Sequence, residues 1–265
     1  MIGRRMFGFP WVLPSAFLAG GMMLASVPPA VAAEPEVGTA VLIKKKVTGK
    51  LGTDERELKT GSRVHRNELL QTGPQAQAEL KLDDNTKLAL GPDAELRLDE
   101  YSVAAGSDTK TIALKLLKGT LRFLTGSNAS ESYKIETPSA TIGVRGTVFD
   151  IYVAPEGDTL VLLHQGEVEV CSRSRTCRPH RDSGRIVRAT LPGIVSQPIK
   201  WTADLVPGVR VAHAFPFVGK RLTIDPVRRL RHDVITDGVR VIEQGGKTIE
   251  RTFKKKALDI SLSAI

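Results

Sequence analysis

Three glycines, each followed by a short apolar strand pattern, recur along the chain and limit the folds it can adopt. They lie in Lys118–Phe123, Arg145–Phe149 and Gln165–Val170, and the spacings from Gly119 to Gly146 and on to Gly166 are 27 and 20 residues. Glycine allows backbone dihedrals that other residues resist, and the residues after it are good strand formers. Repetition at this interval is typical of strands that coil and stack on the previous turn. A jelly roll or barrel with equally short strands fits the irregular spacing as well.

The residues before these segments also predict short, half-buried strands. Leucines alternate with charged or polar residues in Ala76–Leu82, Thr86–Leu90 and Ala94–Leu98, and turn signals separate the three runs at Asp83–Asn85 and Gly91–Asp93. The aromatic content of 5% is low, whereas 24 glycines are present, which favours many short strands over a helical bundle. We therefore expect an all-β body, either β-solenoid-like or a β-sandwich.

The first 33 residues have the layout of a secretory signal peptide. Basic Arg4-Arg5 precedes the apolar stretch Trp11–Val27, and small residues follow it. Cleavage after Ala32 or Ala33 leaves a mature chain that begins at Glu34. Two alternatives stay open. The apolar stretch approaches the length that spans a membrane, so it could be retained as an uncleaved anchor. The paired arginines could direct twin-arginine export in place of the default Sec route.

Charge divides the mature chain into an acidic body and a basic tail. From Cys171 to the end there are 19 Lys and Arg against 8 Asp and Glu, a balance of +11, although the whole chain has a net charge of only +9. We expect a signal peptide at 1–33, an all-β domain at 34–196 and a basic C-terminal extension at 197–265. The extension forms either a small β unit or an arm that orders on a partner.

The basic tail indicates which partners an exported protein of this kind can have. Anionic lipid head groups, cell-wall polymer and an acidic protein surface all fit its charge. A solvated basic face without a partner fits equally well. Nucleic acid is excluded by the predicted export and by the lack of a recognised nucleic-acid-binding signature.

The two cysteines, Cys171 and Cys177, predict a disulfide. In an oxidising compartment, two cysteines at the end of one strand and the start of the next close a small hairpin. A zinc site would have to recruit His180, which gives only three ligands at poor spacing. The disulfide is therefore favoured over a metal.

Arg145 and Pro138 indicate corners of the sheet. Pro138 cannot donate a hydrogen bond to a strand ladder, so it belongs at an edge or a corner. Arg145 lies between Val144 and Gly146, where its five N–H donors would satisfy several corner carbonyls at once. The alternative is a solvated arginine in an ordinary turn.

These motifs resemble the FecR-domain family. The resemblance rests on Thr137-Pro138-x-Ala140, Val144-Arg145-Gly146-Thr147-x-Phe149 and Gly166-x-Val168-x-Val170, and it extends over roughly 41–190. It implies an all-β periplasmic domain that makes protein contacts in signalling. The motif residues carried over as structural site residues are Thr137, Pro138, Arg145, Gly146, Thr147, Phe149 and Gly166.

The chain departs from the regulators of that family at its N-terminus. Family regulators carry a cytoplasmic segment that binds a sigma factor, then one membrane helix, then this domain. Only about ten residues precede the apolar stretch here, too few for a cytoplasmic domain. We therefore expect a stand-alone exported form without the anti-sigma segment.

Catalytic signatures are absent from the sequence. The motifs G-x-S-x-G, H-E-x-x-H and G-x-x-x-x-G-K-[ST] do not occur. The neighbouring carboxylates Asp83-Asp84 and Asp99-Glu100 point to opposite faces of a strand, although carboxylates from different strands could still pair, as in glycan cleavage. We expect a non-catalytic interaction or scaffold module without cofactor or metal, whose partner is an unidentified envelope protein. The alternative is a protein that binds or processes cell-wall or exported polysaccharide, against which the scarcity of aromatic residues argues.

Overall fold

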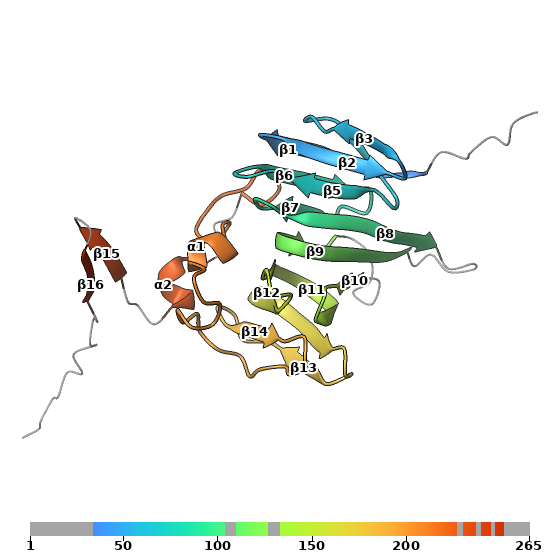
Figure 1. The fold of residues 1–265 in the computed structure, drawn as a ribbon. Coiled ribbons are helices and arrows are strands. Elements are labelled where there is room, and N and C mark those ends of the chain that lie inside the picture. Colours follow the sequence, from blue (N-terminus) through green and yellow to red (C-terminus); the bar gives the residue numbers. More distant parts are fainter. Residues whose placement is uncertain are drawn as a thin grey trace, which may run out of the picture. The chain divides into compact units, whose positions relative to one another are not determined.

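The computed structural model describes residues 34–103, 110–126, 133–226, 230–236, 240–244 and 247–251; the predicted signal peptide lies outside these ranges. Strands make up most of the regular structure (Figure 1), which confirms the expectation of an all-β body. The two helices in the described ranges span four residues each, so no helix there is long and apolar enough to cross a membrane.

The elements follow one another along the chain with short connections. In order they are β1 (Glu36–Lys44), β2 (Val47–Leu51), β3 (Asp54–Glu57), β4 (Arg63–His65), β5 (Leu69–Thr72), β6 (Gln77–Leu82), β7 (Lys87–Leu90), β8 (Glu95–Val103), β9 (Lys110–Leu124), β10 (Tyr133–Glu136), β11 (Ala140–Val153), β12 (Thr159–Ser172), β13 (Cys177–His180), β14 (Ile186–Ala189), α1 (Val211–Ala214), α2 (His232–Ile235), β15 (Arg240–Gln244) and β16 (Lys247–Arg251).

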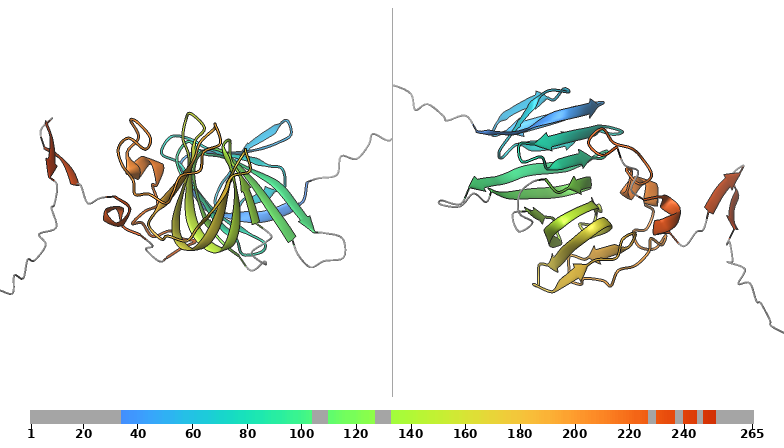
Figure 2. Two further views of the ribbon diagram at one scale, coloured as in Figure 1. Left: turned by 90° about the horizontal axis from the view of Figure 1, so that it is seen from below. Right: turned by 180° about the vertical axis from the view of Figure 1, so that it is seen from behind.

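Strand pairing arranges β1 to β14 in two layers that share three long strands (Figures 1 and 2). One layer runs in the order β4, β1, β6, β7, β9, β11, β12, β14. The other runs in the order β3, β2, β5, β8, β9, β10, β11, β12, β13, with β10 parallel to β9. We call the first the covered layer and the second the open layer, after what lies on their outer faces.

Three glycines mark the points where the shared strands pass from one layer to the other. Gly119 in β9, Gly146 in β11 and Gly166 in β12 have φ angles of 78°, 61° and 88°. In β9, for example, the residues after the glycine pair with β7 and those before it pair with β8. A left-handed φ lets the backbone bend without the strain that a side chain would cause. The recurring glycines of the sequence are therefore the corners of a folded sheet.

Both descriptions offered by the sequence apply to this architecture. The strands stack largely in chain order, as in a solenoid, while the two layers pack face to face, as in a sandwich. Phe123 of the covered layer contacts Tyr133 of the open layer and Phe149, at ring-centroid distances of 5.5 and 5.3 Å. These rings lie in the cluster of buried side chains between the layers, where each fully buried Leu or Phe contributes about 1.5–3 kcal/mol.

Residues 199–226, which we call the cover segment, pack on the outer face of the covered layer. Trp201 and Phe215 are buried there, and they share a cluster with Tyr152 and Leu160 of the strands. This burial removes the outward apolar side chains of the covered layer from water, and hydrophobic burial is the main favourable term in folding.

Hydrogen bonds fix the cover segment at two further points. The Thr120 hydroxyl donates to the carbonyl oxygen of Ala214 at 2.9 Å, and the backbone N–H of Ile224 donates to Oε2 of Glu79 at 2.9 Å. Because Thr120 and Glu79 lie on different strands, the segment is held across the layer and not at one edge alone.

The predicted C-terminal extension, residues 197–265, contains both packed and separate elements. The cover segment lies within it, and β15 pairs with β16 as an antiparallel hairpin in which Gln244 lies opposite Lys247. The domain boundary placed after residue 196 stays a prediction.

Candidate interaction surface

The outer face of the open layer presents side chains to solvent, whereas that of the covered layer is buried. Lys115, Lys118 and Lys134 keep 39%, 55% and 53% of their side-chain surface exposed. On the covered layer, the outward residues Arg122 and Glu79 are 0% and 1% exposed. The open face is therefore the broad sheet surface available to a partner among the described residues.

Lysines on this open face form ion pairs with acidic side chains, so both signs of charge lie side by side. Lys118 pairs with Glu95 at 2.9 Å, Lys134 pairs with Glu136 at 2.6 Å, and Lys115 pairs with Asp99. The hydrogen bond from Lys118 holds the pKa of Glu95 below its ordinary value, and the hydrogen bond to Asp99 raises the pKa of Lys115. Exposed pairs of this kind add only about 0–1 kcal/mol to stability, so their main effect is to fix a charge pattern.

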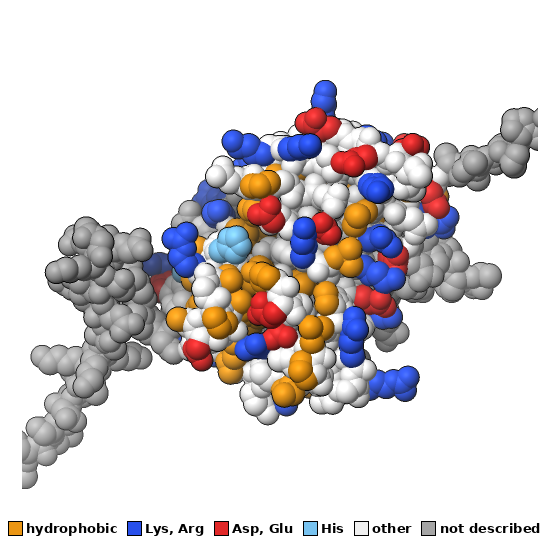
Figure 3. Space-filling view, viewed as in Figure 1, with side chains coloured by type: hydrophobic (Ala, Val, Ile, Leu, Met, Phe, Trp, Pro, Cys, Tyr) orange, Lys and Arg blue, Asp and Glu red, His pale blue; other side chains and the backbone are white. Residues whose placement is uncertain are grey.

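An open groove of about 360 Å³ lies at one end of this face. Its charged walls come from Lys46, Glu55, Asp93, Glu95 and Lys118. Cations and anions thus alternate around a shallow hollow beside the edge strand β3. Figure 3 shows cationic and anionic side chains intermingled, with hydrophobic side chains between them, on the side of the molecule seen in Figure 1.

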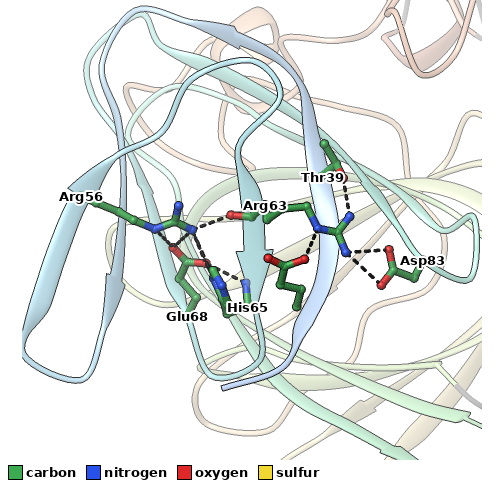
Figure 4. Close-up of polar contacts among 7 residues, drawn as sticks. Thr39, Arg56, Arg63, His65, Glu68 and Asp83 are labelled. Atoms are coloured by element: carbon green, nitrogen blue, oxygen red, sulfur yellow. Dashed lines mark hydrogen bonds and ion pairs between the residues drawn. The ribbon is translucent and has the colours of Figure 1, made fainter. Parts of the chain in front are cut away.

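A buried carboxylate anchors the edge strand β3 (Figure 4). Glu68 is 0% exposed and accepts hydrogen bonds from Arg56 Nη2 at 2.9 Å and from the backbone N–H of His65 at 2.8 Å. The same Nη2 donates to the carbonyl oxygen of Arg63 at 2.5 Å. A Cβ added at Gly49 would lie 2.0 Å from Oε1 of Glu68, so only glycine leaves room for this carboxylate.

A second arginine fixes the neighbouring strands β1 and β4 (Figure 4). Arg63 donates to Glu36 at 2.7 Å and to the Thr39 hydroxyl at 2.6 Å, and it reaches Asp83 at 3.3 Å. The hydrogen bond with Glu36 is the largest cause of the raised pKa of Arg63. The four residues of β3 itself are exposed and mostly acidic, and charged residues of this kind protect an edge strand from unwanted pairing.

Two of the motif residues close the turn between β10 and β11. The Thr137 hydroxyl donates to the carbonyl oxygen of Ala140 at 3.0 Å and accepts from the Ala140 N–H at 2.9 Å, and Pro138 lies between them. The Thr159 hydroxyl donates to the Thr137 hydroxyl at 2.7 Å. Because Thr159 belongs to the covered layer, these hydroxyls join the two layers at this corner.

Three motif residues lie at another corner, where β11 and β12 bend. A Cβ on Gly166 would lie 2.5 Å from the carbonyl oxygen of Gly146, and the Thr147 hydroxyl donates to the carbonyl oxygen of Glu167 at 2.6 Å. The backbone of Arg145 lies opposite Glu167 in the ladder, but its side chain is not among those described, so the proposed corner contacts stay a prediction.

The structure therefore does not bring the motif residues together as one cluster. They occupy two corners, with Phe149 in the core, and their contacts serve the fold. The charged residues of the open face were read from the sequence only as polar positions of half-buried strands. What identifies these residues is that they point to the same outer face from adjacent strands. This becomes visible only once the strand pairing is known.

Cys171 and Cys177 form a disulfide that closes the β12–β13 hairpin. Both sulfur atoms are engaged with each other, so they do not offer zinc the thiolates it requires. The His180 ring points elsewhere, with Nε2 at 3.1 Å from the carbonyl oxygen of Arg185. The Cys171–Cys177 disulfide is typical of proteins in an oxidising compartment such as the envelope.

A buried Asp–His pair has some likeness to a catalytic arrangement. His164 Nε2 lies 3.1 Å from Asp150 Oδ2, while Arg122 donates to both oxygens of Asp150 at 2.5 and 2.8 Å. Burial opposes ionisation of Asp150, but the charges of Arg122 and His164 outweigh it and hold the pKa of this carboxyl well below its usual range. All three side chains are at most 1% exposed.

The contacts of this cluster point to a structural role. Arg122 also donates to the carbonyl oxygen of Phe217 at 3.3 Å, and its guanidinium carbon lies 5.7 Å from the Phe217 ring centroid. The cluster therefore fastens the cover segment to the covered layer. The His164 imidazole lies beneath the cover segment with 0% of its side chain exposed, out of reach of a substrate.

Comparison with known proteins gives one family match. Residues 68–169 match the family model described as FecR protein. Two matching crystal structures, at 1.65 and 2.50 Å resolution, are of a candidate anti-sigma factor from Parabacteroides distasonis ATCC 8503. Each structure matches with 17% sequence identity and a TM-score of 0.39. The match covers 48% of this chain and 57% of the other, so this chain spans little more than half the length of those proteins. A search of curated proteins gave no match.

Proposed function

We propose that the protein is a non-catalytic module that binds another envelope protein through the open face; the match of residues 68–169 to the FecR family model supports this proposal. The observation that carries the proposal is the difference between the two outer faces. The chain covers one with its own cover segment and leaves the other exposed, ordered and charged. Most of the open face lies within the segment that matches the family.

The chemistry of the open face suits a partner surface that also carries both signs of charge. The paired Lys115, Lys118 and Lys134 alternate with acidic neighbours over adjacent strands. Complementary charges of this kind favour specificity and fast association more than raw affinity. A specific complex requires about 800 Å² of surface from each partner, which a sheet face of several strands can supply.

Export to the periplasm and a role in envelope signalling belong to the same proposal. The disulfide and the signal-peptide layout of residues 1–33 support export. Among the described side chains, the body tyrosines do not favour the polysaccharide alternative: Tyr133 and Tyr152 are 2% and 4% exposed, and the side chain of Tyr101 is not among those described.

Site-specific photo-cross-linking in intact cells tests the proposal. A photoreactive residue at position Lys134 should give one discrete protein adduct, and Lys115→Glu should abolish it. Lys220→Glu makes the same charge change on the cover segment and should leave the adduct intact.

Two results would reject the proposal. One is an adduct that survives Lys115→Glu and is equally strong from position Lys220, which would mean that the open face is not selective. The other is loss of the adduct after digestion of envelope glycan, which would favour the polysaccharide alternative.

A further inference from the structure

Two large aliphatic side chains project from the turn after β14. Ile194 is 66% exposed and Leu191 is 45% exposed, whereas the leucines and isoleucines of the strands are mostly buried. Pro192, between them, is exposed as well. The turn connects β14 to the bridge at Val195 and lies at the end of the stack remote from β1 (Figure 1). Exposed aliphatic residues that cluster in this way mark interaction sites more often than singly exposed ones do.

Local contacts hold this turn rigid. The backbone N–H groups of Gly193 and Thr190 bond to the carbonyl oxygens of Thr190 and Ile194, each at 2.9 Å, and the N–H of Leu191 donates to Asp158 at 3.2 Å. These hydrogen bonds order the turn. Leu191 rests beside Gly157, where an added Cβ would lie 3.1 Å from its Cδ1, and still keeps 45% of its surface exposed, whereas Ile194 keeps 66%.

The disulfide hairpin lies against this turn and adds positive charge. The Ser174 hydroxyl donates to the carbonyl oxygen of Gly193 at 3.2 Å, which joins the two loops. Arg173 and Arg175 flank that serine, and both are exposed and form no ion pair with a described residue. We call Arg173–Arg175 together with Leu191–Ile194 the tip.

We propose that the tip docks on an anionic lipid bilayer, with Leu191 and Ile194 inserted at the head-group boundary and the two arginines on lipid phosphates. Aliphatic side chains beside cations are the combination that peripheral proteins present to such membranes. The tip comprises seven residues, none of them aromatic, whereas protein interfaces involve about 20–30 residues a side and are enriched in Tyr, Trp and Phe at their centres. The tip lies outside the FecR match, so this proposal stands independently of the open face.

The inference can be tested with residues Glu34–Ile265, which form one compact unit. The measurement is the binding of this protein to phosphatidylglycerol vesicles. The double change Leu191→Ser and Ile194→Ser should weaken partitioning about thirtyfold, which corresponds to about 1 kcal/mol for each aliphatic group. Arg173→Gln should weaken it about fivefold. Leu117→Ser, at another exposed leucine, serves as the matched control and should change nothing.

A depth measurement separates the tip from the basic tail. Trp201, the single tryptophan of this unit, is 7% exposed, so a tryptophan placed at Ile194 reports on its own surroundings. Brominated lipids should quench Ile194→Trp and leave Leu117→Trp unaffected. Equal quenching at both positions, vesicle binding that ignores the Leu191 and Ile194 changes, or no vesicle binding at all would overturn the inference.

Discussion

Replacing Gly166 by alanine tests whether the glycine corners set the two-layer fold. The new Cβ would lie 2.5 Å from the carbonyl oxygen of Gly146 and 3.0 Å from Cα of Thr147, both backbone atoms, at a φ of 88°. The left-handed conformation costs about 1–2 kcal/mol, and overpacking adds about 1–3 kcal/mol. Gly166→Ala should therefore lower the free energy of unfolding by about 2–5 kcal/mol.

Gly146→Ala provides the matched control for this prediction. Its φ is 61°, but a Cβ there would meet nothing within 4 Å, so only the backbone cost of about 1–2 kcal/mol applies. Urea unfolding followed by circular dichroism measures both variants under the same conditions. If the two alanines cost the same within about 0.5 kcal/mol, the close packing of β11 against β12 at this corner is not what requires glycine, and the reasoning fails.

Three further changes address other parts of the fold. Asp150→Asn leaves the buried charge of Arg122 unpaired and should cost about 3–5 kcal/mol in chemical unfolding. Because folding lowers the pKa of Asp150, the stability it supplies is present above the unfolded value of about 3.9 and lost as the pH falls below it, so the variant should show a flatter acid limb than the wild type. Gly49→Ala should expel the carboxylate beneath it and speed proteolysis at β3, whereas unchanged cleavage would contradict the anchor described for that strand. Replacing both Cys171 and Cys177 by serine should cost no more than about 2–3 kcal/mol, because the loop they close is short; thermal unfolding with and without reductant checks this.

The sequence allowed the corners to be predicted because glycine has a specific backbone role. The spacing of Gly119, Gly146 and Gly166 indicated bends in strands, and the structure has a positive φ at each. The short leucine-alternating runs likewise appear as strands. The predicted half-burial is wrong for β6 and β7, because Glu79 and Ala89 on their outward faces are also buried, under the cover segment. At the corners the local pattern and the long-range fold require the same residues.

The buried ionic cluster could not be predicted in the same way. In Leu121-Arg122-Phe123 the alternating pattern predicts that the arginine points outward from the strand and is solvated. The side chain does point outward, but it is buried. It is buried only because the cover segment, almost one hundred residues later in the chain, lies over that face. The partners Asp150 and His164 become its neighbours through strand pairing, which the sequence pattern does not reveal.

The charged face of the open layer has the same origin. Lys115, Asp99 and Glu136 lie on three different strands. The Lys115–Asp99 pair depends on the antiparallel β8–β9 ladder, and the Lys115–Glu136 pair depends on the parallel placement of β10 beside β9. Parallel neighbours are joined by a long connection, so their register cannot be read from a turn. The candidate surface therefore required the three-dimensional structure.

Lysine footprinting in the intact envelope tests the central claim most directly. Amine-reactive labelling followed by mass spectrometry compares each lysine in the purified protein and in its native surroundings. We expect Lys115, Lys118 and Lys134 to lose reactivity in the envelope while Lys220 on the cover segment keeps it. Equal reactivity of all four lysines in both states, or protection of Lys220 alone, would contradict a partner bound to the open face.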